Sequence, residues 1–243
     1  MRLLRRLLMV ALVSWTAASV AAAVLLRLWL RERYGRGGPI PVSQAATLLH
    51  PLRRRIHPPE EMLAWFGIGR GHTVLELGPG PGYFTVEAAR RAGEAGRVLC
   101  VDIQRGMLEA LRPRLREHNV ANAHPLLGDA TRLPLADGAA DCAYLVTVLG
   151  EVPDRPAALN ELRRVLKPGG ALAFAETLTD PDYVPRDALR DLCRATGFAF
   201  DGERHLLLGY MMRFRKPGEA ASADPPARPT RKRTSSRTRG ERR

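Results

Sequence analysis

The sequence contains few cysteines, and those present form no pattern. Cys100, Cys142 and Cys193 are odd in number and widely spaced, which excludes a disulfide framework and favours a reducing compartment. No pair of them has the spacing of metal ligands, and no histidine cluster accompanies them, so no metal site is expected. Internal repeats are also missing. Global disorder is excluded, because 45% of the residues are hydrophobic and 26% are charged, a composition that allows a packed core.

The net charge of +13 is distributed unevenly along the chain. Residues 1–57 carry ten arginines against one acid, Glu32, and residues 213–243 carry eleven basic residues against three acids. The stretch between them, 58–212, has seventeen basic and twenty-one acidic residues. Because a mildly acidic domain offers no basic groove, we expect no specific nucleic-acid partner.

An uncharged run of twenty residues, Leu7–Leu26, lies near the N-terminus. As a helix it would be about 30 Å long, which matches the hydrocarbon core of a membrane. Trp29 and Tyr34 follow it, where an aromatic belt would lie. The alternatives are a cleaved signal peptide, with 21–23 (Ala-Ala-Ala) as its cleavage site, and a soluble hydrophobic helix. The length of the run favours an uncleaved transmembrane helix.

The chain therefore divides into four parts. We expect a membrane anchor with basic flanks at 1–34, a linker and basic segment at 35–57, one folded domain at 58–216, and a disordered basic tail at 217–243. Slightly more arginines follow the apolar run than precede it, which favours a cytoplasmic C-terminal side.

From Thr73 onward, strand-like apolar runs alternate with amphipathic helices, a pattern typical of an α/β fold with a doubly wound, Rossmann-like parallel sheet. The predicted strands are Thr73–Leu77, Arg97–Asp102, His124–Leu127, Asp141–Val148, Ala171–Glu176, Ala199–Gly202 and Leu206–Phe214. The predicted helices are Glu60–Phe66, Tyr83–Arg91, Met107–Glu117, Pro156–Leu166 and Pro185–Ala195.

A glycine loop follows the first of these strands, with Gly78, Gly80 and Gly82 in ELGPGPG. Glycine allows a tight turn and lets a ligand lie against bare backbone, next to the free N–H groups of a helix N-terminus. A dinucleotide fingerprint would need its third glycine at position 83, which is Tyr83 here. A P-loop is excluded because no Gly-Lys-Ser/Thr follows.

Two acidic residues follow this loop at sequence separations that are typical of a nucleoside-binding site. Asp102 ends the second strand, twenty residues beyond Gly82, where a carboxylate can accept hydrogen bonds from ribose hydroxyls. Asp129 follows the third strand. Each acid alone could cap a helix or a turn. Together with the glycine loop they predict a nucleoside-containing ligand at the carboxyl ends of the strands.

These segments resemble the successive motifs of the class I S-adenosylmethionine-dependent methyltransferases. The resemblance rests on ELGPGPG, VDIQ, GDATRLPLADGAADCAYLVTVLGEV and LKPGGALAFAE, and it covers about residues 58–214. It implies a seven-stranded sheet whose last strand is antiparallel, and S-adenosylmethionine as cofactor. In that family the segment before the first strand often covers the cofactor site.

The resemblance also implies roles for particular residues. The three glycines of the loop would lie under the methionine moiety and the ribose, and Glu76 would orient the amino-acid end of the cofactor. Asp102 would hold the ribose hydroxyls, and Ile103 would pack on the adenine. Asp129 would accept from the adenine amino group, while Ala130 would donate to the ring through its backbone.

The acceptor side is less well defined. Glu151, in the loop after the fourth strand, is a candidate catalytic or substrate-binding residue, although a structural ion pair or cap would also explain it. The neighbouring Asp154 is expected to cap the following helix. An anchor with basic flanks favours a lipid or small-molecule acceptor at an anionic membrane. Since the cofactor is cytosolic, the catalytic domain is expected on the cytoplasmic side.

Two other functions remain open at this stage. One is a catalytically silent cofactor-binding module that serves partners at the membrane. The other is a nicotinamide-dependent reductase, which Tyr83 in the glycine loop disfavours. Oligomeric state and acceptor identity do not follow from the sequence.

Overall fold

The computed structural model describes residues 38–218, together with residues 22, 25 and 29. The strands are β1 (Thr73–Leu77), β2 (Arg97–Asp102), β3 (Ala123–Leu127), β4 (Ala140–Val146), β5 (Leu166–Thr177), β6 (Ala199–Leu206) and β7 (Gly209–Arg215). The α-helices are α2 (Arg53–Ile56), α3 (Pro59–Phe66), α4 (Thr85–Ala92), α5 (Arg105–Glu117), α6 (Arg155–Val165) and α7 (Arg186–Ala195). Two 3₁₀ helices, η1 (Val42–Leu49) and η2 (Leu149–Glu151), complete the list.

The strands form one seven-stranded sheet in the order β3-β2-β1-β4-β5-β7-β6. Neighbouring strands from β3 to β5 pair in parallel, whereas β7 is antiparallel to both β5 and β6. The predicted Rossmann-like sheet with an antiparallel last strand is confirmed. Because β1 and β4 are neighbours at the centre, the strand order reverses there, and α/β sheets bind their ligands beside that reversal.

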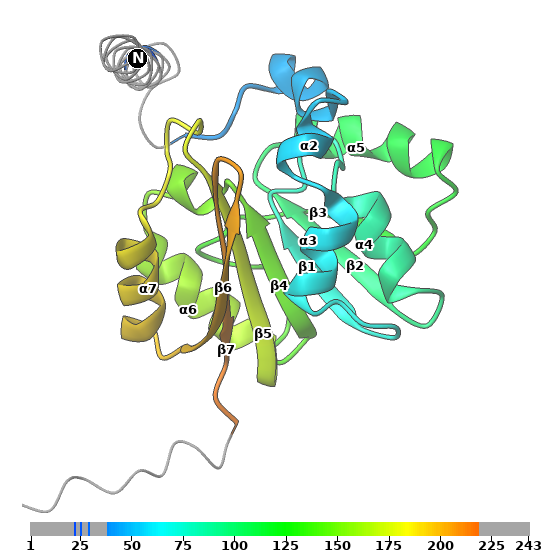
Figure 1. Ribbon diagram of the computed structural model, residues 1–243. Helices are drawn as coiled ribbons and strands as arrows, with labels where there is room; N and C mark the ends of the chain where they lie inside the picture. Colours follow the sequence, from blue (N-terminus) through cyan, green and yellow to red (C-terminus); the bar gives the residue numbers. More distant parts are fainter. Residues whose placement is uncertain (1–21, 23–24, 26–28, 30–37, 219–243) are drawn as a thin grey trace, which may run out of the picture.

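Helices cover both faces of the sheet (Figure 1). On one face, apolar side chains of α3, α4 and α5 pack on β1, β2 and β4. On the other, α6 and α7 pack on β4, β5 and β7. The central strands β1, β4 and β5 are buried on both sides along most of their length, which explains why they read as apolar runs in the sequence.

Several predicted boundaries are wrong by one to five residues, and three of the larger differences have local reasons. Strand β4 stops at Val146 because Thr147 takes a positive φ of 53°, which breaks the extended backbone. Strand β5 begins at Leu166, five residues earlier than predicted, because Leu166 already pairs with Ala140. The last strand begins at Gly209 and not at Leu206, since Leu206 ends β6 in the hairpin.

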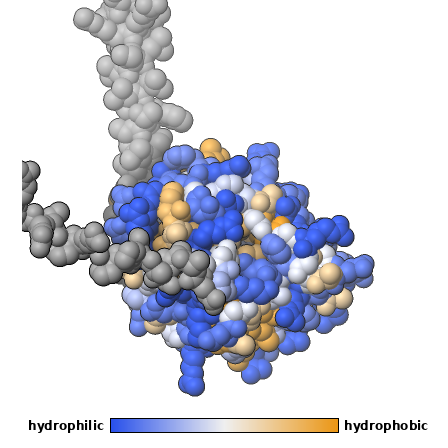
Figure 2. All heavy atoms as spheres, turned by 90° about the horizontal axis from the view of Figure 1, so that it is seen from below, coloured by the Kyte–Doolittle hydropathy of each residue, from blue (hydrophilic) through white to orange (hydrophobic). Residues whose placement is uncertain are grey.

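The carboxyl ends of the parallel strands lie at the top of Figure 1, where α2 and the first described residues also lie. The opposite face, seen from below in Figure 2, is mainly hydrophilic where described residues form it, with small separate hydrophobic patches. No helix within the described ranges is long and apolar enough to cross a membrane. The predicted anchor and the basic tail lie almost entirely outside those ranges, so both stay predictions.

Candidate active site

A pocket of about 470 Å³ opens at the carboxyl ends of the central strands. Its walls come from the loops after β1, β2, β3 and β4, and from the segment that precedes α2. Parallel strands bring these four loops together, although they are far apart in the sequence. The pocket includes all the residues predicted to bind a cofactor except Gly82, and it also includes Glu151.

The glycine loop forms the floor of the pocket. Gly78, Gly80 and Gly82 have φ values of 70°, 53° and 89°, which side chains other than glycine rarely adopt. The Gly78 N–H donates to the Val101 carbonyl at 2.8 Å, and this bond ties the start of the loop to β2. A side chain on Gly82 would overlap Leu111 of α5, so this glycine serves packing below the loop.

We expect Gly78→Ala to destabilise the fold by about 1–3 kcal/mol, because a Cβ there combines an unfavourable φ with overpacking. The added carbon would lie 2.5 Å from Cγ2 of Val148. Gly80→Ala is the matched control, since its φ is also positive but its nearest neighbour, Leu48 Cδ1, is 3.4 Å away. Urea unfolding should show the larger loss for Gly78→Ala, with partial recovery in a Val148→Ala background. Equal losses at the two glycines would remove Val148 as the cause.

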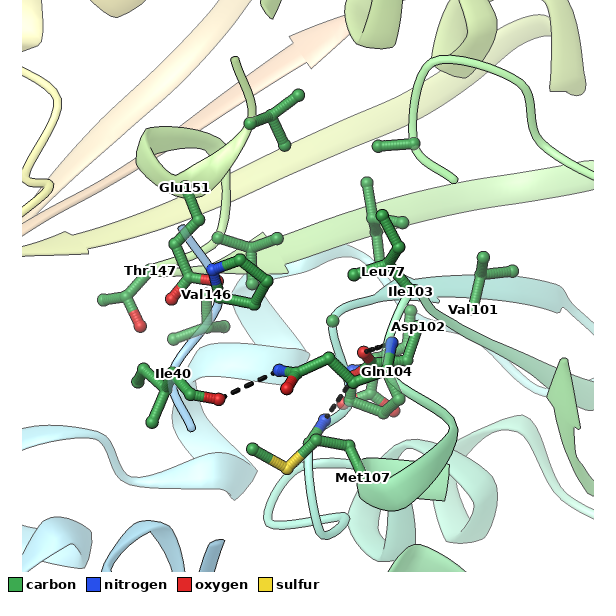
Figure 3. Close-up of a pocket in the computed structure, with 18 of the residues that line it drawn as sticks. Ile40, Leu77, Val101, Asp102, Ile103, Gln104, Met107, Val146, Thr147 and Glu151 are labelled. Atoms are coloured by element: carbon green, nitrogen blue, oxygen red, sulfur yellow. Dashed lines mark hydrogen bonds between the residues drawn. The ribbon is translucent and has the colours of Figure 1, made fainter. Parts of the chain in front are cut away.

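Asp102 lies at the end of β2, with only 7% of its surface exposed. Its Oδ1 accepts from the Gln104 N–H at 2.9 Å, and its Oδ2 accepts from the Gly80 N–H at a long 3.4 Å. Burial raises the pKa of this carboxyl, and the two backbone N–H groups oppose that effect. The Gln104 amide reaches across to the Ile40 carbonyl at 2.9 Å (Figure 3). Oδ2 therefore has acceptor capacity left for a ligand.

The other predicted adenosine contacts line the same end of the pocket. Ile103 is 57% exposed, unusual for a large apolar side chain, and in Figure 3 it lies close to Asp102. Asp129 is exposed, and its Oδ1 accepts from the Thr131 N–H and hydroxyl at 2.7 and 2.8 Å. These bonds lower the Asp129 pKa. Ala130 also lines the pocket.

Glu76 is buried at the end of β1 and lines the pocket. It accepts a hydrogen bond from the Thr85 hydroxyl at 2.6 Å. Burial raises the Glu76 pKa to about 7, although the bond from Thr85 opposes the rise. Tyr144 stands opposite on β4, at the register position paired with Glu76. The pocket wall thus holds a buried carboxyl group that loses its proton less readily than an exposed one.

Glu151 lies in η2 on the side of the pocket away from Asp102 (Figure 3). Burial is the main cause that raises its pKa to about 8, and Asp180, Asp182 and Asp102 add to the rise. It forms no ion pair among the described residues. Asp154 caps α6 through the Ala157 N–H at 3.0 Å, as predicted. The structural ion pair considered for Glu151 is not found in this part of the chain, but the backbone of Ile40 hydrogen-bonds the Glu151 side chain and opposes the rise in its pKa.

The sequence missed part of the pocket wall. The segment assigned to a linker contributes Pro39, Ile40 and Leu48, and α2 contributes Arg53. These residues contact the cofactor loops only because the chain folds back over those loops before it enters α3. The sequence indicated this contact only through the resembling family, in which the segment before the first strand often covers the cofactor site.

The pocket fits a nucleoside cofactor with an amino-acid end. Its volume lies within the usual range for such ligands, about 300–1,000 Å³. Bare glycine backbone faces it at Gly80, where a Cβ would point toward Leu48 across 3.4 Å of space. Asp102 and Glu76 each offer a carboxyl group to the pocket. Within the described residues, no three His, Cys, Asp or Glu side chains are grouped to hold a metal.

Comparison with known families agrees with this geometry. A family model described as "Methyltransferase domain" matches residues 74–170, the span from β1 into β5. Residues 74–170 form a class I S-adenosylmethionine-dependent methyltransferase domain. The family's cofactor is S-adenosylmethionine, as the sequence predicted.

Curated relatives share about half of the chain. The ubiquinone/menaquinone biosynthesis C-methyltransferase UbiE of Klebsiella pneumoniae subsp. pneumoniae is 40% identical over 119 residues, which are 47% of each protein. UbiE of Escherichia coli O9:H4 is 38% identical over the same length. The chain thus spans about half the length of the curated relatives it matches.

Solved structures share the fold. A methyltransferase from Aquifex aeolicus has a TM-score of 0.70 at 21% identity, and the match covers 73% of this chain and all of that one. The [4+2]-cyclase SpnF has a TM-score of 0.59 at 19% identity, covering 65% of this chain and 80% of its own. At such identities the likeness concerns the fold alone.

Proposed function

We propose that this protein transfers a methyl group from S-adenosylmethionine to a small-molecule or lipidic acceptor. One observation carries the proposal: a single pocket joins the three cofactor loops of the domain to the η2 loop that bears Glu151. A cofactor-binding module without catalytic function would need the three cofactor loops but not the η2 loop.

The residues of the pocket divide between the two ends of the cofactor. Asp102 binds the ribose hydroxyls, Ile103 packs on the adenine, and Asp129 and Ala130 hold the edge of the ring. The glycine loop supports the methionine end beside Glu76. When bound, the cofactor supplies a methyl group on a sulfonium, which is already a strong electrophile. The protein's own contribution is to orient the acceptor and to exclude water.

Glu151 faces the acceptor and takes its proton when transfer requires one. Its raised pKa of about 8 suits a general base that works near neutral pH. The largely apolar walls near it, which include Val148, Val152 and Pro153, favour an apolar acceptor. The UbiE relatives, named for ubiquinone and menaquinone biosynthesis, make a quinone-like ring a reasonable first candidate.

We also propose a membrane location, and its support comes from the sequence alone. The apolar run Leu7–Leu26 and the basic residues around it support an N-terminal anchor at an anionic leaflet. The catalytic domain then lies on the cytoplasmic side, where the cofactor is present. This placement would bring a lipidic acceptor close to the pocket.

The direct test uses the full chain in detergent micelles. Calorimetric titration should show micromolar binding of S-adenosylmethionine and S-adenosylhomocysteine, and no binding of NADH. A screen of quinone-like and other lipidic acceptors should then give acceptor-dependent formation of S-adenosylhomocysteine. Binding without turnover on any acceptor would favour the silent module. Absence of binding in a folded sample would end the proposal.

A further inference from the structure

Arg53 is a cation in the pocket wall without a carboxylate partner. It opens α2 and lines the pocket, and it forms no ion pair with any described residue. Within the described residues, its side chain makes one hydrogen bond, from Nη1 to the Leu48 carbonyl at 3.0 Å. A guanidinium has five N–H donors and stays charged in proteins, so several donors remain for a ligand. Desolvating such a charge is costly unless an anion approaches it.

Aromatic rings hold the guanidinium in place. Its Cζ lies 4.8 Å from the centre of the Tyr83 ring and 5.7 Å from that of Phe84. The Tyr83 hydroxyl donates to the His57 carbonyl at 3.0 Å, which ties the end of the glycine loop to the end of α2. The His57 ring in turn hydrogen-bonds the Thr177 hydroxyl of β5 at 2.6 Å. Arg53 is therefore anchored on two sides and needs little reordering to meet a ligand.

The position of Arg53 in the pocket determines which end of the ligand it can contact. Tyr83 directly follows the glycine loop, and Leu48, which accepts from Arg53, also faces Gly80. Asp102 and Asp129 are assigned above to the adenosine, whereas Glu76, which acts on Arg53 through space, is assigned to the methionine end. This end thus offers one cation and one carboxyl group, which is the complement of an α-amino acid's carboxylate and ammonium.

We propose that Arg53 binds the α-carboxylate of the cofactor's methionine end and makes the site selective for ligands that carry it. The proposal rests on the function proposed above and adds the residue that recognises the amino-acid group of the cofactor. Asp180 also favours the charged form of Arg53 through space. The planar fork of arginine matches a carboxylate in a two-point contact, which a lysine would not reproduce.

The test compares two ligands that differ only in the carboxylate, S-adenosylmethionine and its decarboxylated form. Calorimetry on the full chain should show the wild type binding the first about 10- to 150-fold more tightly, the range for a hydrogen bond to a charged group. Arg53→Met should bring that ratio close to one by weakening S-adenosylmethionine alone. Arg53→Lys should keep part of it. Arg55→Met is the matched control, because Arg55 is exposed, lies two residues away and does not line the pocket.

Each outcome has a definite meaning. A wild type that binds both ligands equally, or an Arg53→Met variant that keeps the full preference, overturns the role of Arg53 and leaves the cofactor site intact. A wild type that binds neither ligand overturns the proposed function itself. If Arg53→Met fails to fold, Arg53→Lys and Arg53→Gln decide through the same ratio, which does not depend on activity.

Discussion

Replacing Glu151 by glutamine is expected to lower kcat by about 100- to 10,000-fold on an acceptor that must lose a proton, the usual loss for a general base. Glutamine keeps the shape of the side chain and removes its ability to take a proton. The affinity for S-adenosylhomocysteine should stay within about twofold of wild type, because the cofactor residues lie on the other side of the pocket. Turnover by product formation and affinity by calorimetry measure the two quantities separately.

The pH dependence gives an independent check on the same residue. A base acts in its deprotonated form, and the pKa of Glu151 is raised to about 8. The wild-type rate should therefore rise about tenfold per pH unit below pH 8 and level off above it. The Glu151→Gln variant should lose this rise.

Glu176 supplies the matched control. Burial raises its pKa to about 8 as well, but it accepts from the Val184 N–H at 3.2 Å and does not line the pocket. Glu176→Gln should leave kcat and the pH profile unchanged. Loss of activity in both variants would point to a structural effect of the substitutions, and loss in neither would exclude Glu151 as the base.

Replacing Asp102 by alanine is expected to weaken S-adenosylhomocysteine binding about 100-fold, because two ribose hydroxyls lose a charged acceptor. Asp102 is buried in the wall, and its Oδ2 has only a long bond from Gly80 to satisfy it. Calorimetry on the full chain measures the change, and circular dichroism checks that the fold is kept.

Two variants separate ligand binding from loop support. Asp102→Asn keeps an acceptor for the Gln104 N–H while it loses the charge, so its affinity should fall between wild type and alanine. Asp129→Ala should cost less, about fivefold, because Asp129 is exposed and its Oδ1 is already engaged by Thr131. An Asp102→Ala protein that binds with wild-type affinity would place the ribose elsewhere.

Predictions from sequence succeeded where local pattern and chain order carry the information. Strands β1 and β2 have the predicted bounds, since His72 and Gly78 flank β1, and β2 follows Gly96 and ends with the acidic Asp102. The glycine loop could be located because three glycines next to a strand have few other uses. Asp102 and Asp129 could be brought together before any coordinates, because parallel strands place their carboxyl ends at one edge.

The strand ends were harder to predict, since pairing partners set them. Leu166 belongs to β5 through its partner Ala140, and the conformation of Thr147 ends β4 after a run of apolar residues. Neither fact is visible in a stretch of sequence read by itself. The same holds for the Glu151 pKa, which depends on burial and on Asp180 and Asp182, contributed by another loop.

The sequence by itself determined the fold, the cofactor and one side of the site, because periodicity, turn glycines and strand-end acids are local features with regular spatial consequences. Only the tertiary structure decided what covers that site. Arg53 appears in the sequence as one of three consecutive arginines, and Ile40 as part of a Gly- and Pro-rich linker. They reach the pocket through contacts with Tyr83 and Gln104, far along the chain, and such long-range contacts leave no periodic trace in the sequence.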